Sequence, residues 1–290
     1  MRWLNLTSRS WFLIPAVIGT GLLLLNLYGL HALPDRHPKA MTYVGKHKNA
    51  LPHLTHQQLL EALSKVPKTS DYAYLQTVNR IFASGIVRHW PKTYDSDAAL
   101  TFKENWVIAA LSQAEYLLVQ AGLLDRYRFA LAERRGWEKI ASKGIGFCSQ
   151  IAFAVSDYLG DQDIETQMVG LDGHVIAQAR IANRKYLLDP DYNVVMPFGI
   201  AKAETDPALV SSHYQQAKYS KSKADSVAKI YGEKGNRVGS SDSYHPSVAA
   251  VFYTSEILKW LIPILLVGLG VFGFYRQRPG IGKSSDRAPA

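Results

Sequence analysis

The stretch that decides the fold runs from Gly144 to Pro190 and reads GIGFCSQIAFAVSDYLGDQDIETQMVGLDGHVIAQARIANRKYLLDP. It opens with a glycine-rich turn and continues with apolar residues at helical spacing from Cys148 to Tyr158, until Gly160 stops the helix. Gly and Asn turn residues then separate three short runs of β-type residues: Glu165–Leu171, His174–Ile181 and Lys185–Asp189. The pattern predicts a helix followed by an antiparallel meander.

The residues before this stretch favour helices. Thr55 is a cap for the first of them, and Pro67 ends it. The helical runs are 57–65, 71–82, 104–120 and about 124–133, whereas residues 84 to 98 look irregular. Helices that precede a group of strands are typical of the α+β class. We therefore expect a helical N-terminal half that packs on a small antiparallel sheet.

Two apolar segments lie near the ends of the chain. Trp11–Leu30 has no charged residue, and Ile257–Tyr275 has only Lys259, which lies close enough to the segment's end to reach the interface. Each segment is long enough to cross a bilayer. Neither has the polar, solvent-facing side that a helix of a soluble protein usually has. The first could instead be a signal peptide, but Leu30 at the nearest cleavage position is too bulky, so we favour an uncleaved anchor.

Basic residues at both chain ends predict the orientation. They precede the first apolar segment and follow the second: Arg2, Arg9, Arg276, Arg278, Lys283 and Arg287. Because short cytoplasmic flanks carry such an excess of positive charge, both tails should be cytoplasmic and the residues between them should face outward. Basic residues in 31–56 argue mildly for the opposite orientation, but they belong to a long connecting region where the rule is weak. We expect a bacterial inner membrane, with the domain in the periplasm or outside the cell.

These observations predict a plan for the whole chain. Its parts are tail 1–10, membrane helix 11–30, linker 31–56, catalytic domain 57–205, polar helical region and linker 206–256, membrane helix 257–275 and tail 276–290. Five of the nine histidines lie in the first linker: His31, His37, His47, His53 and His56. Their spacing matches no known metal motif, so we interpret the segment as solvated and expect no metal or cofactor. His89 and Trp90 are interpreted as packing residues.

Charge and cysteine content narrow the classes of function. The formal net charge is +9, but many of the charges flank the apolar segments and no basic and aromatic platform is present, so we expect no nucleic-acid partner. Anionic membrane lipid or an acidic surface polymer is the better-matched partner. The single cysteine cannot form an intrachain disulfide. Outside the cytoplasm, such a thiol is either buried and inert or a nucleophile.

Three residues form a candidate catalytic set. Cys148 stands at the start of the predicted helix, where the partial positive charge of a helix N-terminus lowers a thiol pKa. His174 begins the second predicted strand and offers a base, and Asp189 ends the third and offers a carboxylate that orients the imidazole. Asp191 is an alternative carboxylate. Both strand positions fall at related ends of adjacent antiparallel strands, so packing of the helix across the sheet brings the three side chains together.

The motifs GIGFCSQ at 144–150, GLDGHV at 170–175 and YLLDP at 186–190 resemble the transglutaminase-like superfamily of papain-like cysteine enzymes. The resemblance covers roughly residues 136 to 197. It implies that Cys148 is the nucleophile, His174 the general base and then acid, and Asp189 the orienting residue. It also implies an oxyanion hole formed by the backbone N–H of Cys148 and a second donor, for which the candidates are Asn105, Trp106 and Gln150.

The resemblance implies acyl transfer through a thioacyl intermediate, which water or an amine resolves. A membrane-anchored, outward-facing enzyme of this type is expected to act on an envelope macromolecule, namely a protein, a peptidoglycan peptide or an exopolysaccharide-linked substrate. An envelope protein is a further candidate partner. The rival interpretation is an inactive scaffold or binding module of the same fold in an envelope or polysaccharide assembly. A metal-dependent hydrolase would need a ligand cluster that the sequence does not show.

Overall fold

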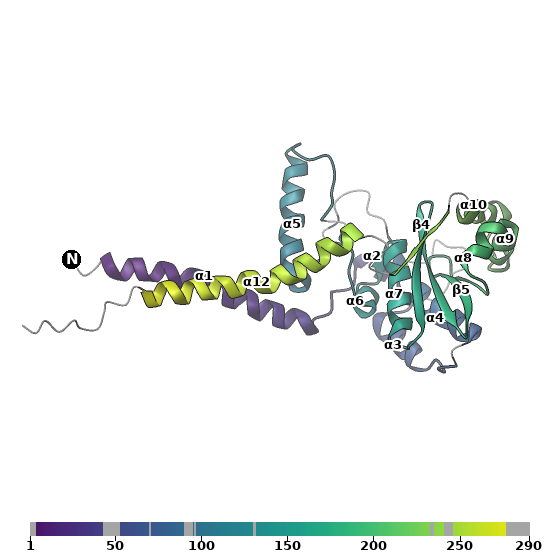
Figure 1. Cartoon of the computed structure of the whole chain (residues 1–290), viewed down its shortest axis with the longest axis horizontal. Coiled ribbons are helices and arrows are strands. Elements are labelled where there is room, and N and C mark those ends of the chain that lie inside the picture. Colours follow the sequence, from purple (N-terminus) through teal and green to yellow (C-terminus); the bar gives the residue numbers. More distant parts are fainter. Residues whose placement is uncertain are drawn as a thin grey trace, which may run out of the picture. The chain divides into compact units, whose positions relative to one another are not determined.

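The computed structural model of the chain describes residues 4–42, 53–69, 71–89, 95, 97–129, 132–232, 235–240 and 246–276. It is a mixed α/β structure that separates into two compact units (Figure 1). The first unit contains Met1–Ala32, Phe102–Val107 and Tyr253–Ala290, and the second contains Leu33–Thr101 and Ile108–Phe252. The expected boundary at residue 57 is therefore wrong, because the globular unit already begins at Leu33.

Two long apolar helices dominate the first unit: α1 (Leu4–His31) and α12 (Pro246–Arg276). Both contain a stretch long and apolar enough to cross a membrane, at Trp11–His31 and Ala249–Arg276. The two backbones approach closely at glycines. A Cβ built on Gly270 would lie 2.6 Å from the Phe12 carbonyl oxygen, which only glycine tolerates. Small residues at such contacts are typical of helix pairs in membranes.

A five-stranded antiparallel sheet organises the second unit. Its strand order is β6-β5-β4-β3-β7. The strands are β3 (Glu165–Leu171), β4 (His174–Ile181), β5 (Arg184–Asp189), β6 (Val194–Met196) and β7 (Arg237–Gly239). The predicted meander is thus confirmed as the centre of the sheet, and a short strand is added at each edge. Leu171 pairs with His174 across a tight turn at Gly173.

Helices cover both faces of this sheet (Figure 1). One face packs against α3 (His56–Ser64), α4 (Tyr72–Gly85), α6 (Trp137–Lys143) and α7 (Cys148–Gly160). The other packs against α8 (Ile200–Thr205), α9 (Pro207–Gln216) and α10 (Lys221–Gly232). Successive residues of β4 alternate between the two cores: Val175 and Ala177 lie in the first, and Ile176 lies in the second. β4 is therefore the central, fully covered strand.

The helices α9 and α10 show that much of 206–256 does not lie outside the domain, where the sequence predicted it. Its polar, lysine-rich composition suggested a region outside the domain, but Val210, Tyr214, Val227 and Tyr231 are buried in the second core. These residues stand four apart within each helix, which places them on one face, and the lysines of α10 are exposed. Residues 207–232 therefore belong to the domain.

The described residues of 31–56 also do not form the solvated linker that the sequence predicted. His37 is only 2% exposed and follows the first residues of the second unit. The Arg36 guanidinium donates hydrogen bonds to the carbonyl oxygens of Leu54 and Gly85, at 2.8 and 3.3 Å. These bonds attach the segment, which includes the short helix α2 (Pro38–Thr42), to the domain. His47 lies outside the described residues, as do Trp90 and the tail residues Arg2, Arg278, Lys283 and Arg287.

Two helix predictions have different outcomes. The Thr55 cap is confirmed, since its hydroxyl accepts from the Gln58 N–H in a capping box. The predicted helix over 124–133 is wrong for the described residues there, which form turns and bends. The carboxylate of Glu115, in α5 (Phe102–Gln120), accepts the backbone N–H groups of Arg128 and Phe129 and so holds the turn. That bonding replaces the hydrogen bonds of a helix.

A glycine substitution tests how the turn before α7 is packed. Gly144 ends α6 at φ +73°, and a Cβ there would lie 2.8 Å from the Arg36 guanidinium carbon. Gly122 has a similar φ of +72° but open space around it. We expect Gly122→Ala to lower the free energy of unfolding by about 1–2 kcal/mol, because of backbone strain alone. Gly144→Ala should lower it by roughly 1–3 kcal/mol more, because the added methyl also crowds a packed side chain.

The measurement is urea unfolding of the full chain in detergent, followed by tryptophan fluorescence. Equal losses for the two variants would show that the contact of Arg36 with this turn does not contribute to stability.

Candidate active site

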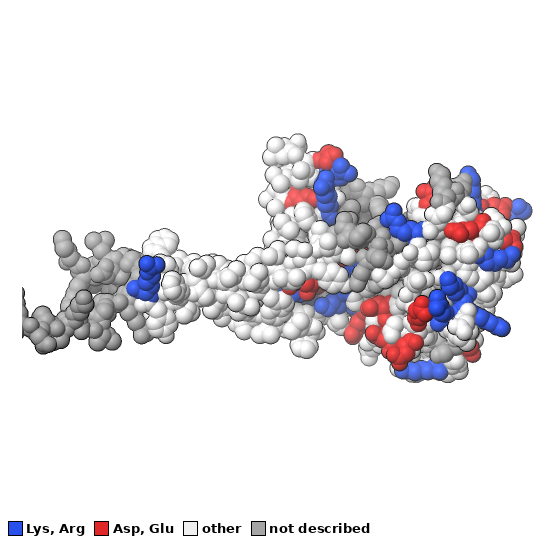
Figure 2. Space-filling model, viewed as in Figure 1, with Lys and Arg blue, Asp and Glu red and all other residues white. Residues whose placement is uncertain are grey.

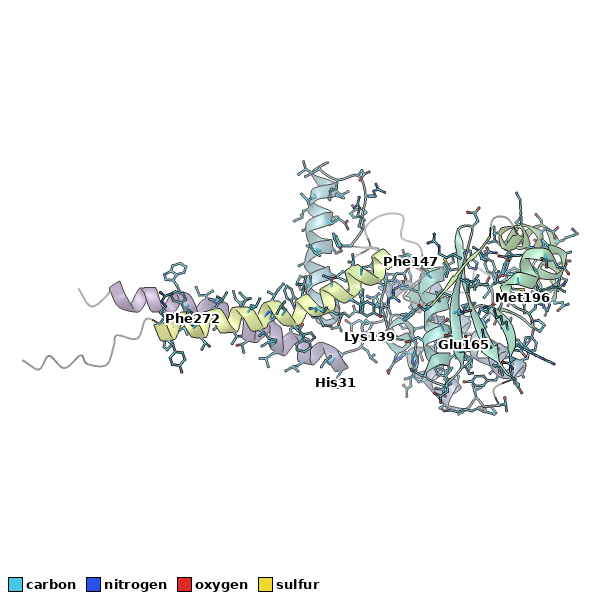
Figure 3. All side chains as sticks on the ribbon, viewed as in Figure 1. His31, Lys139, Phe147, Glu165, Met196 and Phe272 are labelled. Atoms are coloured by element: carbon cyan, nitrogen blue, oxygen red, sulfur yellow. The ribbon has the colours of Figure 1, made fainter. Side chains whose placement is uncertain are left out.

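The turn before α7 positions Cys148. A parallel pair of short strands, β1 (Val87–Arg88) and β2 (Ile145–Gly146), holds that turn. The His89 backbone N–H donates to the Gly146 carbonyl at 2.9 Å. Phe147 then forms the N-cap, and Cys148 is the first residue of the helix (Figure 3). The sulfur is thus held at the positive end of a 13-residue helix, and the residue is 9% exposed.

The predicted histidine and aspartate meet in the structure. His174 begins β4, Asp189 ends the neighbouring β5, and His174 Nε2 donates to Asp189 Oδ2 at 2.9 Å. Both side chains are buried, at 5% and 0% exposure. This bond fixes the imidazole ring and leaves Nδ1 as its free nitrogen, which is buried and has no short hydrogen bond. Nδ1 is therefore the ring nitrogen that is not occupied by Asp189.

Electrostatics favour the protonated form of His174. Burial by itself lowers the pKa of this imidazole. The charge of Asp189 and its hydrogen bond to the ring outweigh burial and, with smaller contributions from the Cys148 thiol and from Asp191, raise the pKa of His174 well above 6.5. His174 is therefore favoured as an imidazolium ion.

Two buried tyrosines complete the surroundings of Asp189. The Tyr214 hydroxyl donates to Asp189 Oδ2 at 2.5 Å, and it bonds to the Tyr231 hydroxyl at 2.9 Å. The Tyr192 backbone N–H donates to Asp189 Oδ1 at 3.3 Å, so both carboxylate oxygens are satisfied. Burial and the charge of Asp189 raise the pKa of both tyrosines well above 10, which keeps their hydroxyls protonated.

Sequence reasoning missed these tyrosines because it assigned 206–256 to a region outside the domain. A usable signal was present: Val210 and Tyr214, and again Val227 and Tyr231, stand four residues apart and mark an apolar face on each helix.

Asp191 does not replace Asp189 as the partner of His174 Nε2. Its Oδ2 lies 4.0 Å from His174 Nδ1 and 3.3 Å from Arg88 Nε. The side chain is 1% exposed, and neither carboxylate oxygen has a hydrogen bond of good geometry. Burial and the nearby charge of Asp189 raise the pKa of Asp191 to about 6. The Arg88 guanidinium, which the sequence did not single out, also interacts with the Cys148 side chain.

The oxyanion candidates separate into two groups. Gln150 lies in the first turn of α7, and its Oε1 accepts the Phe147 N–H at 3.3 Å, so it stays beside the Cys148 backbone. Asn105 and Trp106 belong to the first unit, with the apolar helices. The Asn105 amide donates to Ser255 and Glu256 side chains, each at 2.8 Å. The Trp106 indole donates to the Lys259 carbonyl at 3.3 Å. The amide of Asn105 and the indole of Trp106 are thus engaged with α12, and the choice of the second oxyanion donor among Asn105, Trp106 and Gln150 stays a prediction.

A cluster of His37, His89 and Asp95 has the composition of a metal site, with ligand atoms within 4.8 Å of one another. Its hydrogen bonds argue against that use. The Lys39 backbone N–H donates to His37 Nδ1 at 3.0 Å, so the ring proton must be on Nε2, the atom that faces Asp95. A metal-bound Nε2 would need Nδ1 to carry the proton. The sequence predicted a packing role for His89, but its Nε2 forms a hydrogen bond with Asp95 Oδ2 at 2.9 Å.

Comparison of the chain with protein-family models, with curated proteins and with solved structures finds no match. The resemblance to the transglutaminase-like superfamily therefore rests on the motifs between residues 136 and 197, and it stays a prediction.

The Tyr214 hydrogen bond can be tested by removal of its hydroxyl. Tyr214→Phe leaves the buried Asp189 carboxylate with one donor fewer and should lower the free energy of unfolding by about 1–3 kcal/mol. Tyr219→Phe is the control, because its hydroxyl bonds the Tyr192 carbonyl instead. A double-mutant cycle of Tyr214→Phe with Asp189→Asn, measured by urea unfolding, should show coupling. Additive effects would contradict the assigned bond.

Asp191 should make stability depend on pH. Its pKa rises to about 6 on folding, so the folded state holds a proton that the unfolded state releases between about pH 4 and pH 6. Stability therefore falls as pH rises through that window, by up to about 3 kcal/mol. Asp191→Asn should remove this pH dependence, so the variant should become more stable relative to the wild type as pH rises. Asp225→Asn is the control of opposite sign, because pairing with Lys221 lowers the pKa of that carboxyl.

Unfolding midpoints measured from pH 4 to pH 7 decide this prediction. A constant difference between Asp191→Asn and the wild type over that range would contradict it.

Proposed function

We propose that the second unit is a transglutaminase-like cysteine enzyme, which cleaves or transfers an acyl group at an amide or ester bond. The observation that carries this proposal is the arrangement around His174. Nε2 is fixed by Asp189 at 2.9 Å, and the ring also interacts with the only cysteine of the chain, at the start of α7. A nucleophile, a base and an orienting carboxylate are the minimum for this chemistry.

The reaction proceeds in two stages. His174 Nδ1 takes the proton from Cys148 Sγ, and the thiolate attacks the substrate carbonyl carbon, which forms a C–S bond and an oxyanion. The backbone N–H of Cys148, at the helix start, is one donor to that oxyanion, and the Gln150 side-chain amide is the candidate for the second. When the intermediate collapses, the C–N or C–O bond breaks and the imidazolium gives its proton to the leaving group.

The thioacyl enzyme is resolved by water or by an amine. His174 takes a proton from the incoming nucleophile, the new C–O or C–N bond forms, and the C–S bond breaks to return the thiol. The same residues serve both outcomes, so the nucleophile that reaches the acyl group decides between hydrolysis and transfer. Asp189 stays hydrogen-bonded to His174 and to Tyr214 during both stages.

The site of action follows from the two apolar helices. They are consistent with a chain that crosses a membrane twice. The basic flanks of both helices support cytoplasmic tails and a domain that faces outward from a bacterial inner membrane. The substrate class proposed is an envelope macromolecule: a protein, a peptidoglycan peptide or an exopolysaccharide-linked acyl group. The net charge of +9 suits an acidic polymer or anionic lipid near the domain.

A second candidate function is an inactive scaffold or binding module. The observation that favours it is burial, because Cys148 is 9% and His174 is 5% exposed, so a macromolecular acyl group has little access to the sulfur. In that case the same polar cluster would only stabilise the contact between α7 and the sheet.

Thiol reactivity separates these two functions. We expect iodoacetamide to alkylate Cys148 rapidly and at a rate that persists below pH 7, because the imidazolium stabilises the thiolate. His174→Ala should abolish this reactivity at low pH, and Asp189→Asn should weaken it. The reference is Ser222→Cys in a Cys148→Ser background, an exposed thiol on α10 that should titrate near the ordinary thiol pKa of about 8.5.

The measurement is the alkylation rate against pH for the full chain in detergent, by mass spectrometry. A Cys148 profile that follows the reference thiol and does not respond to His174→Ala would reject the enzyme and favour the scaffold.

A further inference from the structure

Large exposed apolar side chains outside α1 and α12 are concentrated in one place. Among the described residues outside those two helices, all but Val238 lie on α5 or in the turn after it. They are Phe102 at 54% exposure, Leu111 at 41%, Leu117 at 60%, Leu118 at 40%, Leu123 at 70% and Leu124 at 43%. We call the five leucines the leucine surface. A soluble domain rarely leaves so many large apolar residues together in water.

The leucine surface contains no charge. Between Trp106 and Leu124 the only charged residue is Glu115, which is buried and accepts two backbone N–H groups from the following turn. The other exposed positions of this stretch are alanine, glycine and glutamine. In Figure 2, α5 is white along one edge, and charged residues gather along the other. α10 shows the opposite composition, since its exposed positions include Lys221, Lys223 and Lys229.

The beginning of α5 belongs to the unit of the apolar helices. Besides the bonds of Asn105 and Trp106 to α12, the Lys259 ammonium donates to the Glu104 carbonyl at 3.4 Å. A Cβ built on Gly29 of α1 would collide with the Lys103 carbonyl oxygen. The helix backbone departs from helical geometry at Asn105, with φ −156° and ψ 96°. α5 thus starts in contact with residues near one end of both apolar helices.

We propose that the leucine surface inserts into the lipid bilayer that α1 and α12 cross. This rests on their assignment as membrane helices, and it is independent of the enzymatic function. Leu111 follows Val107, the last α5 residue of the first unit, by only four positions, about 6 Å along the helix. The chain thus has a third exposed apolar surface besides those of α1 and α12. Lipid acyl chains suit a face that is wide, apolar and without charged groups.

The residues that follow match a lipid headgroup region. Asp125, Arg126, Tyr127 and Arg128 come directly after Leu124, and Arg126 has a side chain that is 67% exposed. Arginine and tyrosine are favoured where an apolar face reaches the charged boundary of a membrane. The second unit thus has a membrane contact of its own, besides its chain connections to α1 and α12.

Spin-label accessibility tests this proposal on the full chain. In a Cys148→Ser background, single cysteines are introduced at Leu118 and, in separate protein, at Leu123. The bilayer reference is Leu265→Cys, a 54% exposed position of α12, and the water reference is Ser222→Cys on α10. All four are labelled and placed in nanodiscs of phosphatidylglycerol and phosphatidylcholine. Collision rates with oxygen, which concentrates in lipid, and with a water-soluble nickel chelate are then compared.

We expect both leucine positions to resemble the α12 reference, with an oxygen-to-nickel ratio several-fold above that of the α10 reference. A ratio equal to the α10 value would overturn the proposal. Protection from both reagents would overturn it as well, because it would mean that a second copy or a partner protein covers the surface. The two labelled positions guard against a local disturbance by the label, since Leu118 lies within α5 and Leu123 lies in the turn after it.

Discussion

The buried hydrogen bond between His174 and Asp189 is the constraint on which the rest of the domain depends. A charged pair removed from water is stabilising only when further hydrogen bonds compensate for lost solvation. Asp189 receives these from the Tyr192 backbone and the Tyr214 hydroxyl, and Tyr231 supports the latter. Because the tyrosines come from α9 and α10, the catalytic carboxylate needs the second layer of helices. A domain that ended at residue 205 would leave the second face of the sheet open and Asp189 short of a donor.

The same requirement explains the three-layer arrangement. β4 is covered on both faces, so His174 at its start is shielded by residues of both cores. α7 brings Cys148 from one side, whereas α9 and α10 bring the tyrosines from the other. Asp191 Oδ2 lies 4.0 Å from His174 Nδ1 and 3.3 Å from Arg88 Nε, so a second buried carboxyl group, paired with Arg88, lies close to the base. The site therefore joins three helices and two strands of the sheet, and none of these elements contains a complete site alone.

The unit that contains α1 and α12 is held together by a different kind of interaction. Its helices are held by close backbone approach at glycines and by a few polar contacts, such as the hydrogen bond of the Asn26 amide to the Lys259 carbonyl. In a bilayer, helix association comes from such packing and bonding, because lipid is as apolar as the side chains. Asn105 and Trp106 serve this unit. Both donate hydrogen bonds to residues of α12.

The sequence by itself determined the local elements: the two apolar helices, the α7 helix with its glycine-rich turn, the meander, and the order of Cys148, His174 and Asp189. Periodicity and turn residues specify these features over a few neighbouring positions. Only the tertiary structure decided what lies across the sheet. The partners of Asp189, the pairing of Arg88 with Asp191, and the His37, His89 and Asp95 cluster join residues far apart in the chain. No local pattern marks such contacts, because they arise when helices pack on both faces of one strand.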